Sequence, residues 1–138
     1  MKRYLLDTNI VSELRKRKPH GAVLTWFRGL HEEQIFISAV TMGELQAGIE
    51  LTRTQDPQKA GEIENWLDQI ADSYQVLPMG TPCFREWGRL MQGKEDELIE
   101  DGMIAATGRV HGLVVATRNE SDFRRLKVEI FNPFRPAS

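Results

Sequence analysis

The chain has 138 residues, of which 41% are hydrophobic and 28% are charged, and its formal net charge is −2. This length predicts one domain of ordinary size, over residues 1–138, with a real hydrophobic core. The sequence excludes a membrane span, because it contains no run of about 18 apolar residues. The net charge argues against a generally basic coat for nucleic acid.

Short apolar runs alternate with longer amphipathic runs along the chain. The apolar runs predict strands at residues 3–7, 34–38, 74–78, 113–117 and 128–133. The amphipathic runs predict helices at residues 8–17, 22–30, 41–51, 56–74, 81–92, 96–112 and 121–126. This alternation predicts an α/β domain whose central, mostly parallel sheet is flanked by helices.

Capping residues mark several helix ends. Thr8 or Asn9 is expected to cap the first helix, and Asp56 precedes a proline at the start of the fourth. Thr81 is expected to cap the fifth helix. Gly112 is expected to end the sixth. The single cysteine, Cys83, cannot form an internal disulfide. The apolar stretch near the first residue is too short for a signal peptide. We therefore expect a cytoplasmic protein.

Asp7 ends the first predicted strand, where the apolar run stops abruptly. It could be a turn or cap residue, or one member of a charged site. Binding sites of parallel α/β sheets lie beyond the carboxyl ends of the strands. Residues 117–122, TRNESD, follow another buried strand. We therefore expect this segment and Asp7 to lie on the same rim of the sheet.

Glu44 stands three residues after Thr41, which is the spacing of a capping box at a helix start. At helical spacing it also shares a side with Val40, Ala47, Gly48 and Leu51. A carboxylate buried among such small and apolar residues is costly unless it is paired. Both interpretations, a local cap and a functional carboxylate, are open at this point.

Asp101 lies within the apolar stripe of the sixth predicted helix. Leu98 is three residues before it, and Ile104 and Ala105 are three and four residues after it. The small residues Ala105 and Gly108 leave room beside it. The neighbouring acids of this segment are more simply explained as solvated residues near a helix N-terminus.

Acidic residues with space around them predict a cation site, because carboxylates packed together repel one another. His20, His31 and His111 are scattered, and with Cys83 they give no zinc spacing. Ligands that are all oxygen suit Mg²⁺ or Mn²⁺. A hard cation held by carboxylates typically acts on phosphate esters.

Five segments carry a family resemblance: LLDTNIVSEL, ISAVTMGELQAGI, EDGMIAATG, LVVATRNESDF and VEIFNPF. Their order and spacing, over nearly the whole chain, resemble PIN domains, in particular the VapC toxins of bacterial type II toxin–antitoxin pairs and their FitB-like branch. The resemblance implies a PIN-like fold and a Mg²⁺- or Mn²⁺-dependent ribonuclease. Carried over residue by residue, it implies metal-binding and catalytic roles for Asp7, Glu44 and Asp101.

The resemblance also identifies polar residues around these acids. Thr8 and Asn9 match the residues that follow the first acid. The family often has a fourth acid after the strand at 113–117, where this chain has Asn119. Asp122, three residues later, is either a metal-site residue or, in competition with Ser121, a helix cap. This departure leaves open whether one metal or two would bind.

Partners follow from the same resemblance. It implies a homodimer, a VapB-type antitoxin whose tail covers the acids, and an RNA substrate, with transfer RNA favoured by analogy. Trp26 and Phe27 are either core residues or surface for a partner helix.

Two other function classes are compatible with parts of the sequence. A haloacid-dehalogenase-like phosphatase needs a second aspartate two residues after the first, where this chain has Asn9. A PIN domain that has lost activity, and acts by binding antitoxin or RNA, is the stronger rival, because Asn119 replaces an acid.

Overall fold

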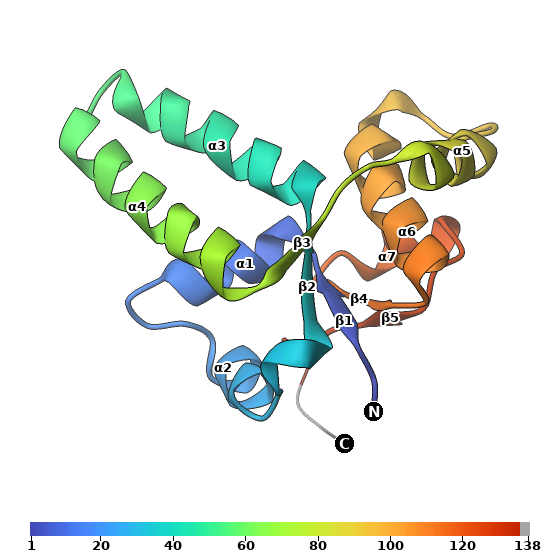
Figure 1. Cartoon of the computed structure of the whole chain (residues 1–138), viewed down its shortest axis with the longest axis horizontal. Coiled ribbons are helices and arrows are strands. Elements are labelled where there is room, and N and C mark those ends of the chain that lie inside the picture. Colours follow the sequence, from blue (N-terminus) through green and yellow to red (C-terminus); the bar gives the residue numbers. More distant parts are fainter. Residues whose placement is uncertain (136–138) are drawn as a thin grey trace.

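Five short strands form one sheet in the order β3-β2-β1-β4-β5, and every neighbouring pair is parallel. The computed structural model describes residues 1–135 and is shown in Figure 1. The strands are β1 (Tyr4–Leu6), β2 (Ile35–Ser38), β3 (Gln75–Leu77), β4 (Val114–Ala116) and β5 (Ile130–Phe131). The predicted parallel sheet is confirmed, although each strand is shorter than its apolar run.

Seven α-helices connect and cover the strands in the described part of the chain. They are α1 (Thr8–Arg15), α2 (Gly21–Arg28), α3 (Ala39–Arg53), α4 (Pro57–Ser73), α5 (Thr81–Leu90), α6 (Ile99–His111) and α7 (Glu120–Arg125). Short 3-10 turns at Glu32–Gln34 and Asp96–Leu98 precede β2 and α6. Figure 1 shows α1 to α4 on one side of the sheet and α5 to α7 on the other. The predicted α/β class is therefore confirmed.

Strand β1 lies at the centre and gives one side chain to each core layer. Leu5 is in register with Phe36 of β2 and Val115 of β4, and all three belong to the core under α5, α6 and α7. Leu6 packs in the other core, with residues of α1 and α2. A strand covered on both faces has no polar face, which explains why β4 is apolar throughout and why β2 is apolar up to the terminal Ser38.

Three predicted N-caps are wrong, because in each helix the N-cap is an earlier residue than expected. Asp7, and neither Thr8 nor Asn9, caps α1, because its extended backbone lets its carboxylate accept from the Thr8 amide. Ser38, the last residue of β2, caps α3 in the same way, because its hydroxyl accepts from the Val40 amide. Gly80 precedes α5, so Thr81 is already helical. In the first two cases the last residue before the helix serves as the cap, which leaves no separate linker.

The predicted signals at the start of α4 and at the end of α6 are confirmed. The Asp56 side chain accepts from the Lys59 amide at the start of α4. Gly112 ends α6 with φ 65°, a left-handed conformation that glycine adopts without a Cβ clash. Cys83 is a buried thiol. Among residues 1–135, no helix has the length and apolar character needed to cross a membrane.

Candidate active site

Asp7 is a buried carboxylate at the carboxyl end of the central strand, with only 4% of its surface exposed. Its Oδ1 accepts from the Thr8 amide at 2.8 Å. Its Oδ2 accepts from the Thr117 hydroxyl at 2.8 Å and from the Asn9 side-chain amide at 3.1 Å. These donors come from α1 and from the residue after β4, so Asp7 is fixed where two neighbouring strands end.

Glu44 lies beside this position on α3 and is joined to α1 through Thr8. The Thr8 hydroxyl donates to Glu44 Oε1 at 2.7 Å and lies 3.0 Å from the hydroxyl of the buried Thr41. Thr41 is therefore inside the helix, and the capping-box interpretation of Thr41 and Glu44 is wrong, because Ser38 already caps α3.

The expected apolar surroundings of Glu44 are also wrong. Glu44 is exposed, as are Ala47 and Gly48, and 75% of Leu51 is exposed to solvent. These residues do share one side of α3, but that side faces outward because Thr41, Leu45 and Ile49 face the core. The charged Glu44 carboxylate therefore keeps contact with water, has little desolvation cost and is accessible to a ligand.

Asp101, Asn119 and Asp122 form the other half of the site. The Asn119 side-chain amide donates to Asp101 Oδ2 at 3.2 Å and to Asp122 Oδ2 at 2.9 Å. The predicted capping role of Asp122 or Ser121 is wrong: α7 begins at Glu120, with Asn119 at the N-cap position. Asp122 lies in the first turn, and its carboxylate faces Asn119. We call Asp7, Glu44, Asp101, Asp122 and Asn119 the acid site.

Electrostatic repulsion links the two halves of the acid site. Burial of the half-buried Asp101 side chain is the main reason why the pKa of Asp101 rises to about 7. The negative charges of nearby acids raise it further: Asp7, Asp122, Glu44 and Glu100. A carboxylate surrounded by other carboxylates lacks a counter-charge, and a bound cation would supply it.

The pKa of Asp7 is also raised, mainly by burial. The hydrogen bonds from Thr117 and Thr8 oppose this by stabilising the charged form, and the bond from Asn9 adds to them. The nearby charge of Glu44 raises the pKa of Asp7 again. The site therefore holds Asp7 by hydrogen bonds that favour its ionised form despite burial.

Within residues 1–135, no three Asp, Glu, His or Cys side chains already lie close enough together to ligate one metal ion. Hydroxyl and amide donors from Thr8, Asn9, Thr117 and Asn119 occupy several carboxylate oxygens instead. The donor set is nevertheless all oxygen and strongly acidic, which fits a hard divalent cation and does not fit zinc.

Two residues of this region were not recognised in the sequence. Thr117 binds Asp7 and also accepts from the Asn119 amide at 2.9 Å. Thr41 contacts Thr8 from the interior of α3. Thr117 follows a buried strand as Asp7 does, and this parallel could have identified it. Thr41 carried no separate signal, because its spacing to Glu44 matched a cap.

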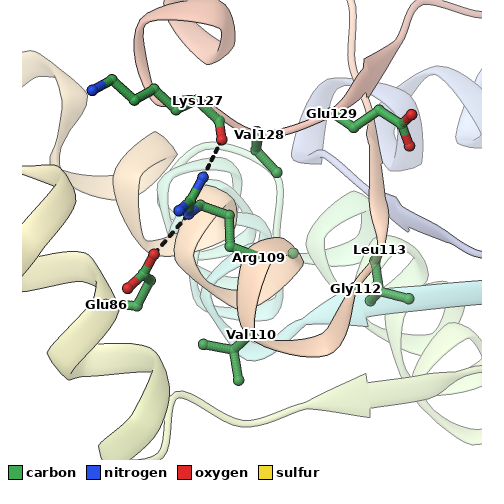
Figure 2. A pocket seen from close by; sticks show the side chains of 9 residues that line it. Glu86, Arg109, Val110, Gly112, Leu113, Lys127, Val128 and Glu129 are labelled. Atoms are coloured by element: carbon green, nitrogen blue, oxygen red, sulfur yellow. Dashed lines mark hydrogen bonds and ion pairs between the residues drawn. The ribbon is translucent and has the colours of Figure 1, made fainter.

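A cavity of about 570 Å³ at the opposite edge of the sheet does not contain the acids (Figure 2). It is lined by residues next to the amino ends of β4 and β5, among them Leu113 and Glu129. The Arg109 guanidinium crosses it, donating to Glu86 at 2.6 Å and to the Lys127 carbonyl. The Arg109 guanidinium is already paired with Glu86 and is therefore not free to bind an anionic ligand.

Comparison with known proteins agrees with this geometry. A family model described as PIN domain matches residues 4–129. The chain is 36% identical over 140 residues to "VapC ribonuclease Y4jK" of Sinorhizobium fredii, covering 96% of this chain and 99% of that protein. It is 33% identical over 138 residues to "Toxin FitB" of Neisseria gonorrhoeae, covering 94% and 97%.

The fold is shared with a solved relative. The crystal structure of FitAcB from Neisseria gonorrhoeae superimposes with a TM-score of 0.85 at 33% identity, covering 96% of this chain and 99% of that one. The matched family model includes Asp7, Glu44, Asp101, Asn119 and Asp122. The chain belongs to the PIN-domain family.

Proposed function

We propose that this protein is the toxin of a type II toxin–antitoxin pair and a metal-dependent endoribonuclease that hydrolyses RNA phosphodiester bonds. The observation that carries the proposal is the acid site, where carboxylates from β1, α3, α6 and α7 gather at one edge of a parallel sheet. The names of two relatives that match nearly its whole length, a ribonuclease and a toxin, support the same assignment.

Asp7, Glu44 and Asp101 would hold Mg²⁺, or Mn²⁺, in this proposal. A divalent cation bound there would polarise the scissile phosphate and lower the pKa of an attacking water. Asp7 is positioned by Thr8, Asn9 and Thr117. Asn119 keeps Asp101 and Asp122 in place through one side-chain amide.

The residues around the metal-binding acids have separate roles in the proposed reaction. Thr8 aligns Glu44 from α1, so that acids on separate helices keep one geometry. Asn119 is neutral, yet its amide oxygen can orient water near the acids. Asp122 adds charge that Asn119 lacks. Since attack by water needs no 2′-hydroxyl, the products should carry a 5′-phosphate and a 3′-hydroxyl.

The direct test uses purified protein, free of antitoxin, and a structured RNA, with transfer RNA as the first choice by family analogy. We expect cleavage with Mg²⁺ or Mn²⁺, loss of cleavage in EDTA, and fragments that a 5′-phosphate-dependent exonuclease degrades. Fragments ending in a 2′,3′-cyclic phosphate would contradict the water-attack mechanism.

A second candidate function is a binding module that acts through antitoxin or RNA without cleavage. Asn119, in the position where the family often has an acid, is the observation that favours it. In that case the protein would bind RNA or antitoxin, while no divalent cation would produce cleavage above an enzyme-free control.

The partner in this proposal is a VapB-type antitoxin. An Arg or Lys side chain from its tail would pair with the acids and displace the cation, since charge-assisted hydrogen bonds to carboxylates are strong. Trp26 and Phe27 pack against the α1–α2 core, and Trp26 also lies edge-on to Tyr4 at 5.1 Å. Their core role limits the surface that α2 can offer.

A further inference from the structure

A groove leads away from the acid site between α1, α3 and α4. Its volume is about 440 Å³. Thr8, Ser12 and Arg15 form the α1 wall, and Glu44 and Gly48 lie on the α3 wall. Apolar side chains of α3 and α4, such as Ile49, line its inner side. The groove begins at the Thr8–Glu44 hydrogen bond and is therefore continuous with the acid site.

The two ends of the groove carry opposite charge. Glu44 is at the acid-site end, and Arg15 is the last residue of α1 at the other end. Arg15 is exposed, and no carboxylate among residues 1–135 lies within ion-pairing distance of it. Its neighbour Lys16, in contrast, pairs with the buried Glu13 at 2.9 Å. Arg15 is therefore available to an external anion.

The spacing of the α1 wall fixes how far this cation is from the acids. Thr8, Ser12 and Arg15 are four and three residues apart, so they lie on one side of the helix. Seven residues of α-helix span roughly 10 Å. Arg15 therefore lies at the far end of the groove, where it can contact a phosphate next to the one that is cleaved at the acid site.

We propose that this groove holds the RNA strand next to the scissile bond, with Arg15 paired to a neighbouring phosphate. This inference rests on the proposed ribonuclease function. Ser12 offers a hydroxyl, and Gly48 leaves open space, with no atom within 4 Å of the position of a Cβ. Arg15 opens the basic run of residues 15–18, which continues the positive charge beyond the groove. The charge at the Arg15 end suits an RNA phosphate, whereas a basic antitoxin tail would meet Arg15 with like charge.

The first experiment compares Arg15→Ala and Arg15→Lys with a matched control, Arg85→Ala, which removes an exposed arginine on α5. We expect Arg15→Ala to raise the KM for transfer RNA about tenfold, the effect of one charged hydrogen bond, with kcat changed less than about twofold. Arg15→Lys should recover most of the affinity. Arg85→Ala should match the wild type.

Binding of the same RNA in EDTA separates this inference from the proposed function. The slope of log K against log salt should fall by about one for Arg15→Ala and not for Arg85→Ala. A wild type that binds RNA but cleaves none would overturn the nuclease proposal alone. Equal RNA affinities and salt slopes for Arg15→Ala and the wild type would overturn the groove assignment.

A second experiment fills the groove without touching its charge. The test variant is Gly48→Leu and the control is Gly88→Leu on α5, since a Cβ at either position meets no atom within 4 Å. Leucine favours helix more than glycine does, so neither variant should melt earlier than the wild type. We expect Gly48→Leu to raise the KM for RNA and Gly88→Leu to leave it unchanged. A Gly48→Leu variant that binds RNA normally but no longer binds antitoxin would assign the groove to the antitoxin and overturn the inference.

Discussion

The hydroxyl of Thr117 donates a 2.8 Å hydrogen bond to Oδ2 of Asp7, across 110 residues of sequence. The two residues follow β4 and β1, which are neighbours in the sheet, and both side chains are buried. This bond is the largest of the interactions that lower the pKa of Asp7 against the effect of burial. Thr117 therefore favours the ionised form of Asp7 and partly offsets the effect of burial on the pKa of Asp7.

Thr117→Val, which keeps the shape of the side chain, should raise the pKa of Asp7. Because a cation binds the ionised carboxylate, the Mg²⁺ midpoint at pH 7 should rise, and the pH profile of cleavage should shift to higher pH. Stability should fall by about 1 kcal/mol. Thr117→Ser retains the hydroxyl and serves as the control. Identical pH profiles for the Val and Ser variants would refute this role.

Asp7→Asn and Asp101→Asn should each abolish RNA cleavage while the fold persists. Asparagine keeps the size of the side chain but cannot supply the negative charge that the cation needs. Cleavage should fall to the level of an enzyme-free control, with an unchanged circular dichroism spectrum. In EDTA, Asp101→Asn should melt no earlier than the wild type, since it removes repulsion from Asp7, Asp122 and Glu44. Full activity in either variant rules out the site assignment.

The free energy of unfolding in EDTA should carry a signature of Asp101. Its pKa is about 7 in the folded protein, against an ordinary value of 3.8, so between these pH values the folded state binds more protons than the unfolded state. The contribution of Asp101 to stability is therefore complete below about pH 4 and is lost as the pH rises through 7.

Denaturant titrations from pH 4.5 to 8 would measure this effect as the difference between the wild type and Asp101→Asn. The pKa values of Glu13 and Glu86 are lowered by hydrogen bonds from Lys16 and Arg109, so these groups affect stability in the opposite direction. Their contributions are the same in both proteins and cancel in the difference. Relative to Asp101→Asn, the wild type should become less stable with rising pH. A difference that stays constant over this range would show that Asp101 titrates normally.

Asp122 and Asn119 can be distinguished by their effect on metal dependence. If Asp122 supplies charge to the cation, Asp122→Ala should raise the Mg²⁺ midpoint for cleavage more than Asn119→Ala does. Melting curves separate this effect from stability, and Asp122 is not the cap of α7. Equal shifts in both variants would mean that Asp122 acts only by holding Asn119. An unchanged midpoint in Asp122→Ala would reduce the metal site to Asp7, Glu44 and Asp101.

We also expect a homodimer, and a tighter complex when antitoxin is present. Sedimentation velocity at micromolar concentration should give twice the monomer mass of 15.8 kDa. Added antitoxin should stop RNA cleavage, and Mg²⁺ should compete with it if an arginine or lysine of its tail pairs with the acids. A monomer at this concentration would disprove the dimer, whatever the result with antitoxin.

The sequence predicted the class of fold and the positions of Asp7 and Asp101, because these follow from the apolar runs of strands and the apolar stripes of helices. Buried strands read as continuous apolar runs, and Asp7 was identified as the residue where the first run stops. Asp101 was identified as an acid within an apolar helical stripe, and the structure places it half-buried in contact with Asn119.

What the sequence did not predict depends on which element meets which. Helical spacing could not predict that Glu44 is exposed. Spacing shows which residues share one side of a helix, but it does not show whether another element packs against that side. The caps failed where Asp7 and Ser38 each end a strand and begin a helix. Asn119 belongs to no periodic apolar pattern in the sequence. Its hydrogen bonds to Asp101 and Asp122 depend on the packing of α6 against α7.

The strand order places β4, from late in the chain, directly beside the first strand. As the chain emerges from the ribosome, Asp7 and Glu44 come first, whereas Asp101, Thr117 and Asp122 follow only after α4 and α5 have been made. Thr117, which favours the ionised form of Asp7, thus joins it late in translation. A partly synthesised chain therefore has only two of the four acids and lacks β4, which pairs with β1 beside Asp7. The complete acid site can form only on a nearly finished chain.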